Sequence, residues 1–232
     1  MKKLGWGILA TLLSLTILMG CNDDNDGYSL GNFWVAIATV DKHGDSDIDY
    51  TLQLDDENTV LQPVAFGYPH FKTKNNQRVV VNYTILGDKH TADKKKYLVK
   101  VNALKEILTK SILELTEANK DSIGHDPLRV KDMWITNNYL NFKFDYYGGG
   151  KIHFINLVKD PNNATDDNGT ILLELRHNEN DDYRNNLLTG LVSFDLNSLN
   201  LTNNQEVKIK VKAKEYDNHW YEKTFSYTHS VE

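Results

Sequence analysis

The chain lacks the residues that would cross-link it. Among its 232 residues there is 1 cysteine, Cys21, and there are only 4 prolines. A single thiol excludes an intrachain disulfide and a cysteine-based zinc site, so we expect the core alone to hold the fold together. The chain contains 12 Tyr, 8 Phe and 4 Trp. Aromatic residues in this number are typical of a protein whose core is built from β-sheets.

The chain also lacks an excess of positive charge. Its formal net charge is −6, and removal of a leader that carries Lys2 and Lys3 would make it more acidic still. A surface that binds phosphates needs clustered lysine and arginine. The only dense cluster is 94–96, which lies among acidic residues and predicts a solvated loop. We therefore expect no nucleic-acid partner.

Only one long apolar run is present, from residue 4 to residue 19, directly after Lys2 and Lys3. It is too short for a stable membrane span and is typical of a secretory signal. Residues 18–21, Leu-Met-Gly-Cys, resemble the bacterial lipobox, in which the cysteine is acylated before signal peptidase II cleaves. We expect cleavage between Gly20 and Cys21 and membrane anchoring through acyl chains on Cys21. An ordinary signal peptide with a coincidental cysteine is the alternative.

The acidic run 22–26 follows the cysteine at once and predicts a solvated tether over residues 21–31. This run also resembles the export signal that sends lipoproteins of the Bacteroidetes to the outer face of the outer membrane. The expected location is therefore the cell envelope, on the outer membrane and exposed at the surface.

The first half of the mature chain reads as five strands. Residues 33–40 form a continuous apolar run, and residues 45–54 alternate strictly between polar and apolar. Further strands are expected at 59–61, closed by Pro63, at 77–86, and from 96 to about 109, where a helical period also fits. Five strands without a crossover helix predict an OB-like β-barrel over residues 32–117. A polar linker is expected at 117–124.

The second half predicts an antiparallel β-sandwich over residues 118–232. The glycines at 148–150 suggest a hairpin between the strands 139–146 and 151–158. The strand 207–213 alternates apolar residues with lysines, which is typical of a protected strand near a sheet edge. Other strands are expected at 132–136, 170–176, 187–196 and 220–229. The predicted fold class is all-β.

At this point the chain resembles the NigD-like lipoproteins of Bacteroidetes. The resemblance extends over nearly the whole mature chain. Beside the lipobox and its acidic tail, the matching stretches are GYSLG at 27–31, ILTK at 107–110, SIGHDP at 122–127, YLNF at 139–142, HFINLV at 153–158, ELRHN at 174–178 and VSFDL at 192–196. The resemblance implies an OB-like domain followed by a β-sandwich, and a bacteriocin-immunity role. It implies no catalytic or ligand-binding residues.

Two groups of residues suggest chemistry. Asp45, Asp47 and Asp49 have the alternate spacing of a calcium loop, but Tyr50 stands where the loop needs glycine. Strand alternation explains the spacing without a metal, and the 8 histidines show no metal-binding pair, so we expect no metal and no cofactor.

Ser193, Asp195 and His177 have the residue types of a nucleophile, an acid and a base. No Gly-x-Ser-x-Gly elbow accompanies them, so the favoured interpretation is that Arg176 or His177 pairs with a carboxylate such as Asp126 or Asp195.

The remaining candidates concern modification and ligand binding. The Asp-Ser-Ile triplet around Ser122 resembles a short O-glycosylation motif, without deciding whether Ser122 is modified. Exposed aromatics could stack on a sugar or contact a peptide: Tyr68, Trp134, Tyr146, Tyr147 and Trp220. We expect a non-enzymatic binding or protective lipoprotein, with bacteriocin immunity as the function. The alternatives are an accessory lipoprotein that binds a glycan or peptide, and a serine hydrolase that uses Ser193 and His177.

Overall fold

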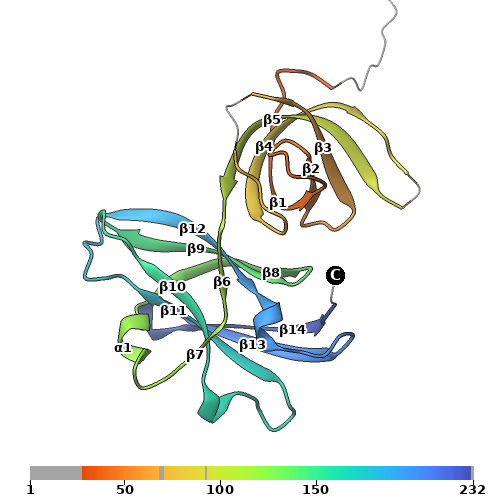
Figure 1. Cartoon of the computed structure of the whole chain (residues 1–232). Coiled ribbons are helices and arrows are strands. Elements are labelled where there is room, and N and C mark those ends of the chain that lie inside the picture. Colours follow the sequence, from red (N-terminus) through yellow and green to blue (C-terminus); the bar gives the residue numbers. More distant parts are fainter. Residues whose placement is uncertain (1–27, 68–70, 92, 231–232) are drawn as a thin grey trace, which may run out of the picture.

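The computed structural model describes residues 28–67, 71–91 and 93–230 and shows two β domains (Figure 1). The first is a closed barrel in the order β1-β2-β3-β5-β4, which is the OB topology expected from five strands. Its strands are β1 (Trp34–Lys42), β2 (Tyr50–Leu54), β3 (Thr59–Phe66), β4 (Arg78–Asp88) and β5 (Lys95–Glu106). The predicted leader, Gly20 and the predicted lipidation site Cys21 lie outside the described residues.

The barrel closes around alternate apolar side chains of its strands. Leu52, Val79, Val81, Val99 and Val101 are fully buried in this core. A β-branched residue suits such a position because it packs well on a pleated surface. Closure leaves the barrel without free edges, which explains how a small domain with no disulfide can remain ordered.

Two predicted strand limits in the barrel are wrong. Strand β3 continues through Pro63, with a register shift between Pro63 and Ala65. Proline lacks an N–H, and the shift accommodates it as a bulge does. Strand β2 begins only at Tyr50, so the preceding aspartates lie in turns. Alternation of residue types alone therefore extended this strand too far.

The second domain is a sandwich of two sheets, with the orders β14-β13-β11-β10-β7 and β6-β12-β9-β8. Its strands are β6 (Leu108–Ser111), β7 (Leu113–Glu114), β8 (Arg129–Thr136), β9 (Tyr139–Gly148), β10 (Phe154–Lys159), β11 (Ile171–Asn178), β12 (Asn186–Asp195), β13 (Glu206–Lys214) and β14 (Trp220–Thr228). Both sheets are mixed, because β6 and β12, β7 and β10, and β11 and β13 pair in parallel. The chain crosses to the opposite sheet at β12 between β11 and β13, and such a crossover is what parallel pairing requires.

The boundary between the domains lies earlier than the predicted residue 117. Strands β6 and β7 belong to the sandwich, since they pair with β12 and β10. The predicted linker is also part of this domain, because it contains the short helix α1 (Lys120–Ile123), whose Ile123 is buried. Local periodicity did not show these features, because pairing with distant strands decides them.

The glycines at 148–150 do not form a hairpin. Strand β9 pairs with β8 and β12, whereas β10 belongs to the other sheet. The glycines therefore carry the chain from one sheet to the other. The lysine-rich strand is confirmed near an edge, because β13 lies between β11 and the edge strand β14.

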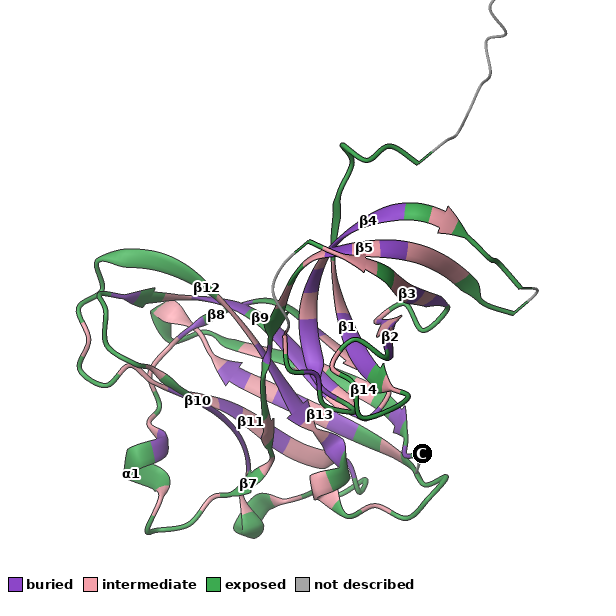
Figure 2. Cartoon of the chain, turned by 45° about the horizontal axis from the view of Figure 1, so that its top comes forward, coloured by how far each residue is buried: buried purple, intermediate pink, exposed green. Residues whose placement is uncertain are grey.

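Figure 2 shows the buried residues of the two domains as separate groups within the barrel and the sandwich. The sandwich core is rich in aromatic residues, among them Phe142 and Phe194, whose rings meet edge to face. No helix in the described part of the chain is long and apolar enough to cross a bilayer.

Candidate ligand-binding sites

The structure does not bring the hydrolase candidates together. Ser193 lies in β12 of the four-stranded sheet, whereas His177 lies in β11 of the five-stranded sheet. Ser193 is 1% exposed, and its hydroxyl donates to Asn141 Oδ1 at 2.7 Å. Asp195 accepts from the backbone N–H of Asn197 and so begins a short 3₁₀ helix. This geometry lends no support to a Ser193 nucleophile.

Ser193 instead belongs to a buried network that joins the two domains. Arg78 of β4 has a fully buried side chain and forms a bidentate ion pair with Asp55, with N–O distances of 2.6 and 2.7 Å. The same guanidinium donates to Asn141 Oδ1 of the sandwich at 3.0 Å. Trp134 Nε1 donates back to Asp55 Oδ2 at 2.8 Å. We call these five residues, Ser193 included, the junction network.

His177 lies in a second buried chain of hydrogen bonds at the far end of the sandwich. Its Nε2 is 2.8 Å from His153 Nδ1, and His153 Nε2 is 3.1 Å from Asp182 Oδ2. Backbone N–H groups of the glycine crossover, at Gly149, Gly150 and Lys151, donate to the same Asp182 oxygen. We call Asp182, His153 and His177 the histidine chain.

The electrostatics of the histidine chain follow from burial and hydrogen bonding. Burial, and next the neighbouring His153, lower the pKa of His177. The three backbone donors, with Gly149 foremost, and the His153 ring hold the pKa of Asp182 well below its usual range. Carboxylates that accept several backbone hydrogen bonds behave in this way.

The ion pair predicted for Arg176 forms with a different acid. Arg176 Nε donates to Glu174 Oε1 at 2.9 Å, and both residues belong to β11. Asp126 accepts from the backbone N–H of Glu179 instead. Residues two apart on a strand share a face, so Glu174 is the acid nearest to Arg176. The prediction named other acids and missed this one.

The aspartates that suggested a calcium loop lie in the turn region before β2. Lys42 Nζ is 3.7 Å from Asp47 Oδ1. Within the described residues, no group of three or more His, Cys, Asp or Glu side chains is placed to hold a metal ion. The strand explanation for the spacing of Asp45, Asp47 and Asp49 is wrong, because these residues lie outside β2.

The predicted aromatic residues are dispersed over the molecule. Tyr68 lies outside the described residues. Tyr146 packs on His153 and His177, and Tyr147 packs on Tyr216. Trp134 and Trp220 lie at two separate recesses described below. Ser122 lies exposed on α1, where its hydroxyl donates to the carbonyl of Asn119.

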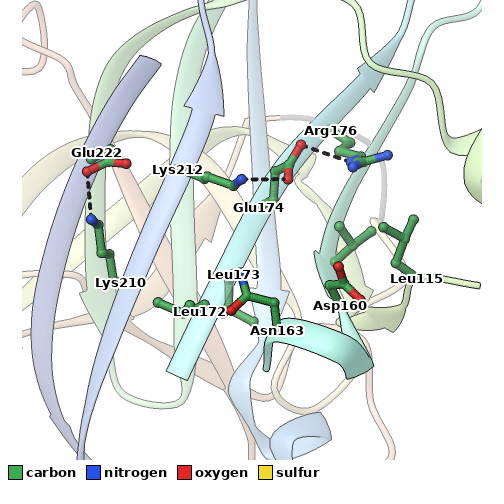
Figure 3. A pocket seen from close by; sticks show the side chains of 11 residues that line it. Leu115, Asp160, Asn163, Leu172, Leu173, Glu174, Arg176, Lys210, Lys212 and Glu222 are labelled. Atoms are coloured by element: carbon green, nitrogen blue, oxygen red, sulfur yellow. Dashed lines mark hydrogen bonds and ion pairs between the residues drawn. The ribbon is translucent and has the colours of Figure 1, made fainter. Parts of the chain in front are cut away.

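The first recess is a groove of about 210 Å³ on the outer face of the five-stranded sheet (Figure 3). Strands β14, β13 and β11 place charged side chains along it, and Leu115 and Asp160 lie at the end opposite Glu222, while Asn163 lies beside Leu173. The charged lining consists of Asp160, Glu174, Arg176, Lys210, Lys212 and Glu222. Three cations thus face three anions.

Glu174 is the centre of the groove's charge network. Its oxygens contact Arg176 Nε at 2.9 Å, Lys212 Nζ at 3.2 Å and His125 Nδ1 at 3.3 Å. Lys212 Nζ also lies 4.7 Å from the centre of the Trp220 ring. Burial lowers the pKa of His125, and the Glu174 charge opposes this shift. The alternating lysines of β13 and the expected ion pair of Arg176 were the sequence signals for this site.

The second recess is a cleft of about 550 Å³ beside the domain junction, which we call the junction cleft. It lies between the edge strands β8 and β14, and Glu57 of the barrel borders it. Trp134, Ile135, Phe225, Ser226 and Thr228 are among its lining residues. Ligand sites in proteins are commonly found between domains and have volumes in this range.

The fold and these recesses define a two-domain protein in which an OB barrel precedes a mixed β-sandwich. The family model for the NigD-like N-terminal OB domain matches residues 37–107, and that for the NigD-like C-terminal beta sandwich domain matches residues 111–227. The chain therefore belongs to the NigD-like family. The two matches also meet where strand pairing places the domain boundary.

Solved structures support the same assignment. A protein of Parabacteroides distasonis, provisionally described as toxin-related, is 36% identical with a TM-score of 0.68, and the match covers 86% of this chain and 94% of that chain. A protein of unknown function from Bacteroides vulgatus is 28% identical, with a TM-score of 0.66 and coverage of 86% and 92%. A NigD-like immunity protein from Bacteroides caccae has the same fold at 24% identity, with a TM-score of 0.66 and coverage of 88% and 99%. A search of curated proteins found no match.

Proposed function

We propose that the mature chain is a non-enzymatic, lipid-anchored protein of the outer membrane that protects the cell by binding a bacteriocin or another polypeptide in the groove. The observation that carries this proposal is the charge pattern of the groove, where three cations and three anions line one recess. A polypeptide carries both signs of charge, so it can satisfy such a lining.

The ion pairs of the groove are suited to exchange. Lys210 Nζ is 2.7 Å from Glu222 Oε2, and these side chains are 39% and 47% exposed. An ion pair at this level of exposure contributes about 0–1 kcal/mol. Breaking it to pair with a partner's charges therefore costs little, while Glu174, only 12% exposed, keeps the lining in place.

Similarity supports the protective role and the anchor. The Bacteroides caccae relative is named as an immunity protein. The lipobox at Cys21 and the acidic run after it support anchoring at the cell surface. The outward side chains of β2 and β3, at Thr51, Gln53, Val60 and Gln62, include neither a base nor an aromatic ring, which argues against nucleic acid on the barrel.

Glycan binding is the rival function, and it calls for several aromatic residues in one groove. None of the described residues that line the charged groove is aromatic, and Trp220 lies beside it only through its contact with Lys212. The lining of this groove therefore favours a polypeptide partner over a sugar.

A protection assay tests the proposal. A strain that lacks the gene is exposed to culture fluid from related strains, and complementation with the wild-type gene is expected to restore survival. Lys212→Glu is expected to abolish protection at normal protein abundance, because it places a third acid against Glu174 and Glu222. Lys208→Glu is the matched control, since Lys208 is an exposed lysine of the same strand outside the groove.

Two further outcomes decide the proposal. Equal protection by the wild type and Lys212→Glu would exclude the groove as the binding site. Labelling with an alkyne fatty acid tests the anchor: label is expected on the wild type and absent from Cys21→Ser. Retained label in Cys21→Ser would contradict the lipobox assignment.

A further inference from the structure

The junction cleft is bordered by two strands that each have a free edge. Among the described strands, β14 pairs only with β13, and β8 pairs only with β9. A free edge presents unpaired backbone N–H and C=O groups, and natural proteins usually protect such a row. The cleft is thus a recess bordered by two rows of unpaired backbone N–H and C=O groups.

The register shows which groups of β14 face away from β13. The backbone N–H of His229 donates to Gln205 O, and the N–H of Glu215 donates to His219 O. In an antiparallel pair, hydrogen-bonded residues alternate with residues whose N–H and C=O point outward. Counting from His229 along the regular register, Ser226 and Thr228 present their backbone groups to the free edge, and both line the cleft.

Strand β8 is oriented in a matching way. The carbonyl of Met133 accepts a hydrogen bond from Lys223 Nζ of β14, so the backbone groups of Met133 face the cleft side. By the same alternation, those of Ile135 do so as well. Backbone groups at every second residue lie about 6.5–7 Å apart, which is the repeat of an extended peptide.

Two charged residues limit the part of the β14 edge that is accessible in the junction cleft. Lys223 bridges β14 to β8, and its ammonium lies 5.0 Å from the centre of the Phe225 ring. An inward-pointing lysine on an edge strand is a device against unwanted strand pairing. Lys223 thus closes the gap on one side, while Glu57 of the barrel borders it on the other. Between them the edge from residue 225 to residue 228 stays accessible.

We propose that the junction cleft binds an extended peptide segment of a partner protein, which adds as a strand along the free edge of β14. Main-chain hydrogen bonds to Ser226 and Thr228 would give affinity, as in other cases of strand addition. The side chains of the peptide would contact Trp134 and Phe225.

This inference shares with the proposed function only the polypeptide nature of the partner, and it concerns a different surface. The two are therefore separable, since the cleft and the groove can be altered independently.

The test uses the acylated mature protein in detergent and a display library of random seven-residue peptides. Selected peptides are resynthesised, and their dissociation constants are measured. Ser226→Pro removes one outward N–H from the cleft, and a proline is tolerated there because that N–H does not pair with β13. Thr224→Pro is the matched control, because it removes the next outward N–H of the same edge at a residue that does not line the cleft.

We expect Ser226→Pro to weaken binding at least tenfold and Thr224→Pro to leave it unchanged, with all three proteins melting at similar temperatures. Methylation of alternate peptide amides is expected to abolish binding. Three results would overturn the inference: no peptide is selected, binding survives Ser226→Pro, or binding responds to Lys212→Glu in the groove instead. The last result would leave the proposed function intact.

Discussion

The sandwich contains a buried polar network at each end, and the two differ in what they connect. The junction network joins the two domains through Arg78, whose guanidinium pairs with Asp55 of the barrel and donates to Asn141 of the sandwich. The histidine chain instead connects segments of one domain, and burial and His153 lower the pKa of its His177. The comparison teaches that one buried network docks the two domains through an ion pair, whereas the other holds segments of a single domain together and includes a histidine whose pKa differs from its ordinary value.

The largest effect is expected from Arg78→Ala. The substitution leaves the Asp55 carboxylate without its bidentate partner and removes the bond to Asn141. Loss of one partner of a buried ion pair costs about 3–5 kcal/mol. Urea unfolding is expected to show this loss. Arg78→Lys is the matched variant and is expected to recover part of it, since it restores the charge without the planar fork.

A smaller effect is expected from Asp182→Asn at the other end. The amide cannot accept hydrogen bonds from three backbone N–H groups and His153 as strongly as a carboxylate does. Hydrogen exchange at Gly149, Gly150 and Lys151 is expected to accelerate, with a modest fall in the urea midpoint. Asp181→Asn, at the exposed neighbouring residue, is the control, and equal acceleration by both variants would contradict the account.

The sequence predicts features that depend on neighbouring residues, but it does not predict contacts between residues that are far apart in the chain. Alternation identified most strands, and five successive strands were enough to predict the barrel. The glycines at 148–150 correctly indicated a change of chain direction, but the predicted pairing of the two flanking strands was wrong. A local signal does not say which sheet the next strand joins.

The same limit applies to Ser193. The hydrolase hypothesis was not the favoured one, but the sequence did not show what Ser193 contacts, because Asn141 and Arg78 are 52 and 115 residues away in the chain. Glu174 was not singled out, because two of the three bases around it, His125 and Lys212, come from segments far from it in the sequence. Contacts between distant strands, which a single sequence does not display, determine both sites.

Ser193→Ala tests how much a single hydroxyl of the junction network contributes to stability. It removes a hydroxyl that donates to Asn141 Oδ1 and accepts a long, 3.5 Å bond from Arg78 Nε, but it leaves Asn141 Oδ1 bonded to Arg78. A single neutral hydrogen bond contributes about 1 kcal/mol, so the unfolding free energy is expected to fall by about that amount. Protection in the complemented strain is expected to be unchanged. Lost protection at normal abundance would show that Ser193 acts in function, and Ser111→Ala at an exposed position of β6 controls for the loss of a hydroxyl.

The smallest effect concerns the pH dependence that the histidine chain adds. The pKa of His177 is lowered in the folded protein, by burial and by His153, whereas in the unfolded chain it returns to its ordinary value of about 6.5. As pH falls from 7 to 5, the unfolded chain therefore binds a proton that folded His177 resists, and stability declines. Asp126 and Glu179 oppose the shift, which limits its size.

His177→Gln is expected to reduce the loss of unfolding free energy between pH 7 and pH 5, because it removes a group that binds a proton more readily in the unfolded chain than in the folded one. His219→Gln, at an exposed position between β13 and β14, is expected to leave the pH profile unchanged. Urea unfolding at several pH values measures the difference. An unchanged profile in His177→Gln would contradict the lowered pKa of His177 in the folded protein.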